Sequence, residues 1–112
     1  MEISYKNGKV KKQCENLREA KKNFSEKVAK KLLKLVNFIS AAENLESVIN
    51  NPVYHFHNLT GDKIGVYSLD IDGRRGSYRL LVTFDDATNV EVFEKSILIV
   101  SIQIEEVSKH YE

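Results

Sequence analysis

The chain has 112 residues, of which 42% are hydrophobic and 29% are charged. This length suits a single domain spanning residues 1–112 around one core. No apolar run reaches the roughly 20 residues that a membrane helix needs. The first residues lack the apolar segment of a secretion signal, so we expect a cytoplasmic protein with no membrane partner. Cys14 is the only cysteine, which excludes an internal disulfide and a cysteine-based metal cluster.

The net charge of +1 conceals an uneven distribution along the chain. Residues 1–50 hold 11 lysines and arginines against 6 acidic residues, whereas residues 51–112 hold 6 against 10. A basic front half is typical of a protein that approaches a polyanion such as RNA. Lysine-rich outer faces are also how ordinary amphipathic helices stay in solution, so charge alone does not choose between the two explanations.

The first half of the sequence predicts helices. Apolar residues at helical spacing indicate one helix over residues 10–24 and a second over residues 28–39, the latter capped by Asn23. A cap signal at Ser40 predicts a short third helix that ends before Pro52. The face of the second helix opposite its apolar stripe is basic and consists of Lys27, Lys30, Lys31 and Lys34.

From residue 63 onward apolar and polar residues alternate, which predicts strands. The segment from Asp72 to Gly76 is typical of a hairpin loop and would connect the first two of these strands. Because the strands follow one another with short links, we expect an α+β fold in which the helices pack on one face of a small twisted antiparallel sheet. The other face is partly polar and free for function. The predicted strand segments are 2–5, 63–71, 77–84, 98–107 and a short one at 90–93.

Polar residues at the strand ends and on the open face suit RNA cleavage without a metal ion. In that reaction imidazole or phenol groups move protons, while guanidinium and ammonium groups stabilise the anionic phosphorane. His55 and His57 share one side of an extended segment but have no third ligand nearby, so the sequence predicts no metal and no cofactor. The candidate residues are His57, Lys63, Arg74, Arg75, Arg79, His110 and Tyr111.

Several segments resemble the HigB toxins, the plasmid-maintenance killer proteins of the RelE superfamily. They are AAENLESV from residue 41, HNLTGDKIG at 57–65, VYSLDI at 66–71, SYRLLVTF at 77–84 and the ending IEEVSKHYE at 104–112. With the lysine-rich helices before them, the similarity extends over nearly the whole chain. The His-x-Leu-x-Gly block followed by Tyr-Arg-Leu about twenty residues later is its most specific part.

This resemblance implies a RelE-like fold and a function. The implied function is that of a type II toxin that cleaves messenger RNA on the translating ribosome, leaves a 2′,3′-cyclic phosphate and thereby arrests growth. The implied partner is a HigA-type helix-turn-helix antitoxin, through which alone the toxin would reach operator DNA. The lysines of the second helix would then contact ribosomal RNA, or serve only as a solvated face.

The resemblance also implies roles for individual residues. His57 matches the histidine that opens the family block and is expected to transfer a proton. Lys63 matches the basic residue after the Gly-Asp pair, with a role in binding or in transition-state charge. Arg79 matches the arginine expected to grip the scissile phosphate, although an ion pair with Asp70 or Asp72 is the structural alternative. His110 and Tyr111 lie where the family often has Tyr-His, in swapped order.

The chain departs from the family pattern at two positions. Asp70 stands where an arginine is frequent, and Lys109 stands where an acid often precedes the terminal pair. Arg74 and Arg75 in the hairpin loop are candidates for the missing cation. Two other functions therefore stay open: a ParE-like toxin that binds DNA gyrase without nuclease activity, and a weakly active relative that acts through antitoxin binding alone.

Overall fold

The computed structural model describes residues 1–85 and 87–109 and has an α+β architecture, as the sequence predicts. Its helices are α1 (Gly8–Glu15), α2 (Leu17–Asn23), α3 (Glu26–Ala41), α4 (Leu45–Ile49) and α5 (Asn89–Glu94). Its strands are β1 (Glu2–Tyr5), β2 (His57–Asn58), β3 (Tyr67–Asp70), β4 (Tyr78–Thr83) and β5 (Ser101–Lys109). Short 3-10 helices cover Pro52–Tyr54, Gly61–Lys63 and Ser96–Leu98.

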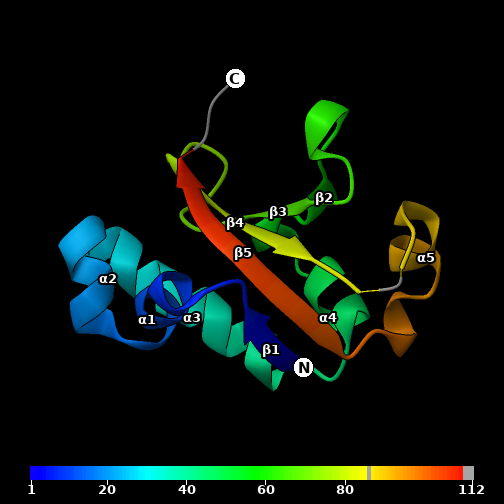
Figure 1. Cartoon of the computed structure of the whole chain (residues 1–112), viewed down its shortest axis with the longest axis horizontal. Coiled ribbons are helices and arrows are strands. Elements are labelled where there is room, and N and C mark those ends of the chain that lie inside the picture. Colours follow the sequence, from blue (N-terminus) through cyan, green and yellow to red (C-terminus); the bar gives the residue numbers. More distant parts are fainter. Residues whose placement is uncertain (86, 110–112) are drawn as a thin grey trace.

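The strands form one sheet in the order β1-β5-β4-β3-β2 (Figure 1). The pairs from β2 to β5 are antiparallel, as expected, but β1 pairs with β5 in parallel. The sheet is therefore mixed rather than wholly antiparallel. A parallel pair needs a long connection, and here the connection includes most of the chain, so the first strand lies beside the last.

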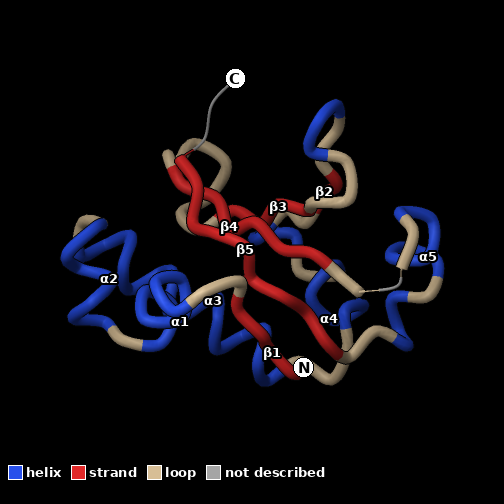
Figure 2. Tube along the Cα trace, in the orientation of Figure 1, coloured by secondary structure: helices blue, strands red, loops and turns tan. Residues whose placement is uncertain are grey.

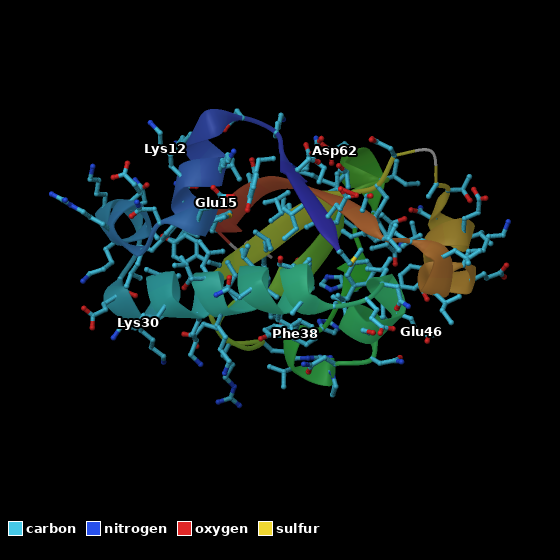
Figure 3. The ribbon with its side chains drawn as sticks, turned by 90° about the horizontal axis from the view of Figure 1, so that it is seen from below. Lys12, Glu15, Lys30, Phe38, Glu46 and Asp62 are labelled. Carbon is cyan, nitrogen blue, oxygen red and sulfur yellow. The ribbon has the colours of Figure 1, made fainter. Side chains whose placement is uncertain are left out.

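Helix α3 contributes a stripe of apolar side chains to the core beside the sheet. Its stripe at helical spacing, which includes Leu32, Leu35 and Ile39, is fully buried. On the facing strands, Leu69 and Leu80 are equally buried and belong to the same core. Figure 3 shows α3 running across the sheet, with Lys30 on its outer side. Within the described ranges, no helix is both long and apolar enough to cross a membrane.

Helix boundaries differ from the prediction where asparagine and threonine side chains cap the backbone. Asn16 is extended and accepts a hydrogen bond from the Glu19 amide, so the predicted helix over residues 10–24 is split into α1 and α2 (Figure 2). The predicted strand at 90–93 is wrong, because this segment is the helix α5. Thr88 and Glu91 form its capping box, a signal that the sequence displays.

A bulge in β5 determines which of its side chains reach the open face of the sheet. Leu81 of β4 lies opposite Glu106, whereas the next residue, Val82, lies opposite Ile104, so Glu105 is the extra residue. In a regular strand, residues at even positions would continue on the buried side of Ile104. The bulge shifts this alternation and places Ser108 opposite Arg79, on the open face.

Candidate functional site

The open face of the sheet carries a cavity of about 760 Å³. This volume lies within the range of pockets that take small ligands. The floor comes from β3, β4 and the end of β5, and the walls come from the segment around β2 and from the hairpin loop between β3 and β4. Its lining consists of His55, His57, Leu59, Thr60, Asp62, Lys63, Ser68, Asp70, Arg74, Arg79, Leu81, Ser108 and Lys109.

The cavity gathers residues from distant parts of the sequence. His57 and Lys63, together with Arg74 and Arg79 of the hairpin, all line it, as the hypothesis of a common site requires. Lysine and arginine outnumber aspartate in the lining by four to two, so the cavity attracts anions. Arg75 is exposed and does not belong to this lining, although it adjoins Arg74 in the sequence.

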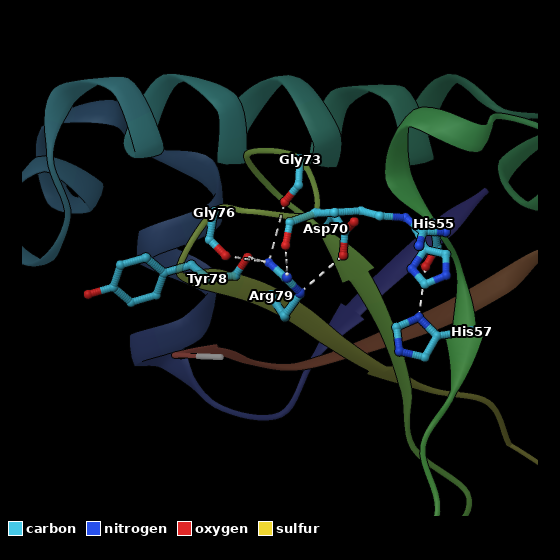
Figure 4. Close-up of polar contacts among 8 residues, drawn as sticks. His55, His57, Asp70, Gly73, Gly76, Tyr78 and Arg79 are labelled. Carbon is cyan, nitrogen blue, oxygen red and sulfur yellow. Dashed lines mark hydrogen bonds and ion pairs between the residues drawn. The ribbon is translucent and has the colours of Figure 1, made fainter. Parts of the chain in front are cut away.

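Two histidines form one wall of the cavity. Their rings lie 4.4 Å apart between centroids, at an angle of 30° (Figure 4). His57 Nδ1 lies 2.9 Å from the carbonyl oxygen of His55. Since a carbonyl can only accept, Nδ1 carries the proton and donates it. The Nε2 atom of a neutral His57 is therefore left as an acceptor, which is the state that a general base needs.

His55 holds a backbone conformation that side chains rarely adopt. Its φ of 44° lies in the left-handed region and turns the chain sharply between the 3-10 helix Pro52–Tyr54 and strand β2. Desolvation lowers the pKa of His55, and although Asp70 opposes this shift, the charges of Arg74, His57 and Arg79 add to it. The surroundings of His55 therefore favour its neutral form.

Arg79 is held by the protein rather than presented to a ligand. Its Nε lies 3.0 Å from Asp70 Oδ1, and both side chains are buried. Its Nη1 donates to the carbonyl oxygens of Gly76 at 2.8 Å and Tyr78 at 3.0 Å, and its Nη2 donates to that of Arg74 at 2.7 Å. Figure 4 shows this arrangement. The ion pair with Asp70 is the structural alternative to the expected contact between Arg79 and the scissile phosphate. The hydrogen bonds from the Arg79 guanidinium to backbone carbonyls fix the conformation of the hairpin loop.

The basic face of α3 is partly engaged by acidic side chains. Lys27 Nζ lies 3.5 Å and Lys31 Nζ 3.2 Å from the carboxylate of Asp72, which fastens the hairpin loop to the helix. Burial raises the pKa of Asp72, but hydrogen bonds and charges from the two lysines outweigh it, so the pKa lies below its ordinary value. Lys30 pairs with Glu26 at 3.2 Å. None of the predicted RNA-contacting residues Lys27, Lys30, Lys31 and Lys34 is among the described residues that line the cavity.

The predicted pair His110 and Tyr111 lies outside the described residues. They directly follow Lys109, which lines the cavity. The sequence prediction missed His55 as a cavity residue. The left-handed turn that places it there is usually marked by glycine or asparagine, and a histidine gives no such signal. It also missed Ser68 and Ser108, although the predicted alternation of β3 already placed Ser68 on the polar face. Among residues 1–85 and 87–109, no three His, Cys, Asp or Glu side chains gather closely enough to hold a metal ion.

Comparison with known proteins finds the same fold in solved structures. Neither a protein-family model nor a curated protein matches the chain. A YoeB/ParE toxin from Agrobacterium tumefaciens aligns with a TM-score of 0.56 at 13% identity over 99% of this chain and 100% of its own. YoeB in a YoeB–YefM complex from Staphylococcus aureus aligns with a TM-score of 0.55 at 20% identity, over 99% of this chain and 98% of its own. A YafQ variant from E. coli aligns with a TM-score of 0.57 at 17% identity, over 97% of this chain and 92% of its own. These similarities show that the chain has the fold of the RelE-like toxins.

Removing the Arg79 side chain should destabilise the protein strongly. The substitution Arg79→Ala leaves the carboxylate of Asp70 buried without its ionic partner, which costs about 3–5 kcal/mol. Urea unfolding of the purified protein measures this loss. The exposed loop residue Arg75 is the matched control, and Arg75→Ala should change the free energy of unfolding by less than about 0.5 kcal/mol. Equal effects of the two substitutions would contradict the structural role of Arg79.

The stability of the fold should depend on the protonation of His55. Because the pKa of His55 is lowered in the folded state, the unfolded chain binds more protons at this site between the folded pKa and pH 6.5. The contribution of His55 to the free energy of unfolding is fully present above pH 6.5, and it is lost as the pH falls through the pKa of His55 in the folded state. Urea unfolding from pH 8 to pH 5 tests this. The variant His55→Asn tolerates the left-handed backbone and should show a flatter profile, whereas parallel profiles would count against the assignment.

Proposed function

We propose that this chain is the toxin of a type II toxin–antitoxin system, a HigB-like endoribonuclease that cleaves messenger RNA on the ribosome. One observation carries the proposal: a single cavity on the open sheet face combines two imidazoles with the cationic groups of Lys63, Arg74 and Lys109. This is the set of groups that cleavage by a ribose 2′-hydroxyl needs. The fold shared with the YoeB and YafQ structures supports the same assignment.

In the proposed reaction His57 acts as the general base. Its Nε2 takes the proton of the 2′-hydroxyl while Nδ1 remains bonded to the His55 carbonyl, which keeps the ring oriented. The 2′-oxygen then attacks the adjacent phosphorus, and Lys63, Arg74 and Lys109 stabilise the negative charge of the phosphorane. The leaving 5′-oxygen takes a proton from His110 or Tyr111. The products are a 2′,3′-cyclic phosphate and a 5′-hydroxyl.

Arg79 has a positioning role in this proposal. Its hydrogen bond to the Arg74 carbonyl, at 2.7 Å, holds the backbone of the loop residue whose side chain lines the cavity. The phosphate is therefore contacted by Arg74, and Arg79 acts through it. Arg75 and the lysines of α3, with Lys34 at the far end of the basic face, lie outside the cavity lining and are proposed to contact ribosomal RNA.

The proposed partner is a HigA-like helix-turn-helix antitoxin that also carries the toxin to operator DNA, and the proposed location is the cytoplasm. The solved YoeB–YefM complex supports the view that a chain of this fold is bound by a second protein. The proposed reaction needs neither a metal ion nor another cofactor, because imidazole and cationic side chains supply its proton transfers and charge stabilisation.

His57→Ala should abolish most of the activity without unfolding the protein. Loss of a general base lowers the rate of cleavage by about 10²–10⁴-fold, so growth arrest on expression should disappear. The measurement is mapping of 5′ ends of transcripts in a translating extract. The matched control is Asn58→Ala on the same strand, because Asn58 is exposed and is not part of the cavity lining. Intact transcripts together with broken DNA would instead identify a gyrase poison.

Arg74 and Arg75 should differ sharply in their contribution to cleavage, although they are neighbours of equal charge. Arg74→Ala removes a cation from the cavity and should lower the cleavage rate by about tenfold or more, the effect of roughly 1.4 kcal/mol of transition-state stabilisation. Arg75→Ala should have a much smaller effect on the rate. Comparison of the two variants on the same messenger in a translating extract tests the placement. If both variants lose activity equally, the cavity does not define the phosphate site.

A further inference from the structure

We infer that Asp70 makes the cavity selective for a guanine base. This inference rests on the proposed function in taking RNA as the ligand, and it adds which base the site accepts. Asp70 places a hydrogen-bond acceptor at the floor of the cavity, so a group that binds to it there must be a donor.

One oxygen of the Asp70 carboxylate has no partner among the described residues. Oδ1 is 3.0 Å from Arg79 Nε, whereas Oδ2 is buried and makes no hydrogen bond within residues 1–85 and 87–109. The residue is only 1% exposed, yet it lines the cavity. A buried carboxylate oxygen without a donor is costly. A donor supplied by a bound ligand removes that cost, so the site favours ligands with N–H groups.

The position of Asp70 argues for recognition rather than proton transfer. Its negative charge is already balanced by the Arg79 guanidinium, which holds the other carboxylate oxygen. His57, with its acceptor Nε2 on the cavity wall, is better suited to take a proton. Asp70 is therefore an acceptor of fixed orientation, and a fixed acceptor distinguishes bases by where their donors lie.

Guanine is the base whose donors match a single carboxylate oxygen best. Its Watson–Crick edge presents N1–H and the N2 amino group side by side, so both can point at Oδ2. Uracil presents N3–H between two carbonyl oxygens. Both oxygens carry partial negative charge, and the carboxylate repels them. The amino groups of adenine and cytosine each stand beside a ring-nitrogen acceptor, and this again faces the negative charge. The carboxylate thus favours guanine over the other three bases.

The rest of the cavity suits a base at this position. The rings of His55 and His57 and the side chain of Leu81 offer flat and apolar surfaces beside the polar floor. Arg74 is exposed in the hairpin loop and also lines the cavity, so it adds a cation that suits the phosphate of a bound nucleotide. Base stacking on aromatic rings adds affinity without selecting a sequence, so selectivity falls to Asp70.

Titration of the protein with 3′-mononucleotides, followed by NMR chemical shifts, tests the inference without requiring cleavage. The wild-type protein should bind guanosine 3′-monophosphate about tenfold more tightly than the uridine, adenosine and cytidine nucleotides, as expected for a well-formed contact to a base edge. Inosine 3′-monophosphate, which lacks the N2 amino group, should bind more weakly than the guanosine nucleotide. The 1-methylguanosine nucleotide should lose the preference.

The variant Asp70→Asn provides the second part of the test. An asparagine can still accept from Arg79 through its oxygen, but it presents an amide N–H₂ where Oδ2 was, so the guanine preference should vanish. The control is Asp62→Asn, which removes the same charge from an exposed position in the cavity lining and should retain the preference. Should Asp70→Asn fail to fold, the comparison of the six nucleotides on the wild-type protein still decides.

The outcomes separate this inference from the proposed function. Equal affinity for all nucleotides, or no binding of any, overturns the guanine site even if the protein cleaves messenger RNA. Cleavage sites without enrichment of guanine overturn it as well. Selective binding of the guanosine nucleotide without any RNA cleavage would uphold the site and reject the nuclease.

Discussion

The buried ion pair between Asp70 and Arg79 is the interaction on which the site depends. It joins β3 to β4 at directly opposed positions, with Nε and Oδ1 3.0 Å apart. The same guanidinium donates to backbone carbonyls of the loop that connects these strands, so it fixes the loop at the edge of the cavity. Burial of two charges is expensive unless each is paired and hydrogen-bonded. The loop carbonyls meet this requirement for Arg79, whereas Asp70 keeps one oxygen without a partner among the described residues.

The two faces of the sheet carry different parts of the structure. One face packs its apolar residues against α3 and accounts for the core. The other presents Ser68 and Asp70 of β3, Arg79 and Leu81 of β4, and Ser108 of β5, and this face forms the cavity. The bulge at Glu105 makes the division possible along β5, because it changes the alternation of that strand between the core and the cavity. Cavity residues can therefore vary without removing apolar contacts from the core.

The sequence was sufficient for the fold class, because the change from helical to strand periodicity is strong and local. The resemblance to the HigB toxins also predicted that His57, Lys63 and Arg79 lie at a common surface, and all three line the cavity. The sequence failed where tertiary contacts decide. The parallel pairing of β1 depends on its partner at the other end of the chain, and the position of His55 depends on a left-handed turn. The sequence left open whether Arg79 would pair with Asp70 or Asp72, and the register of β3 against β4 places Asp70 directly opposite Arg79.

In the proposed mechanism an imidazole and cationic side chains in one cavity promote cleavage of RNA by its own 2′-hydroxyl. Chemical analysis of the ends left on a messenger, after incubation with the protein in a translating extract, tests this mechanism. The expected products are a 2′,3′-cyclic phosphate on one fragment and a 5′-hydroxyl on the other. Fragments that carry 5′-phosphates, or a messenger that remains whole while growth stops, would contradict it.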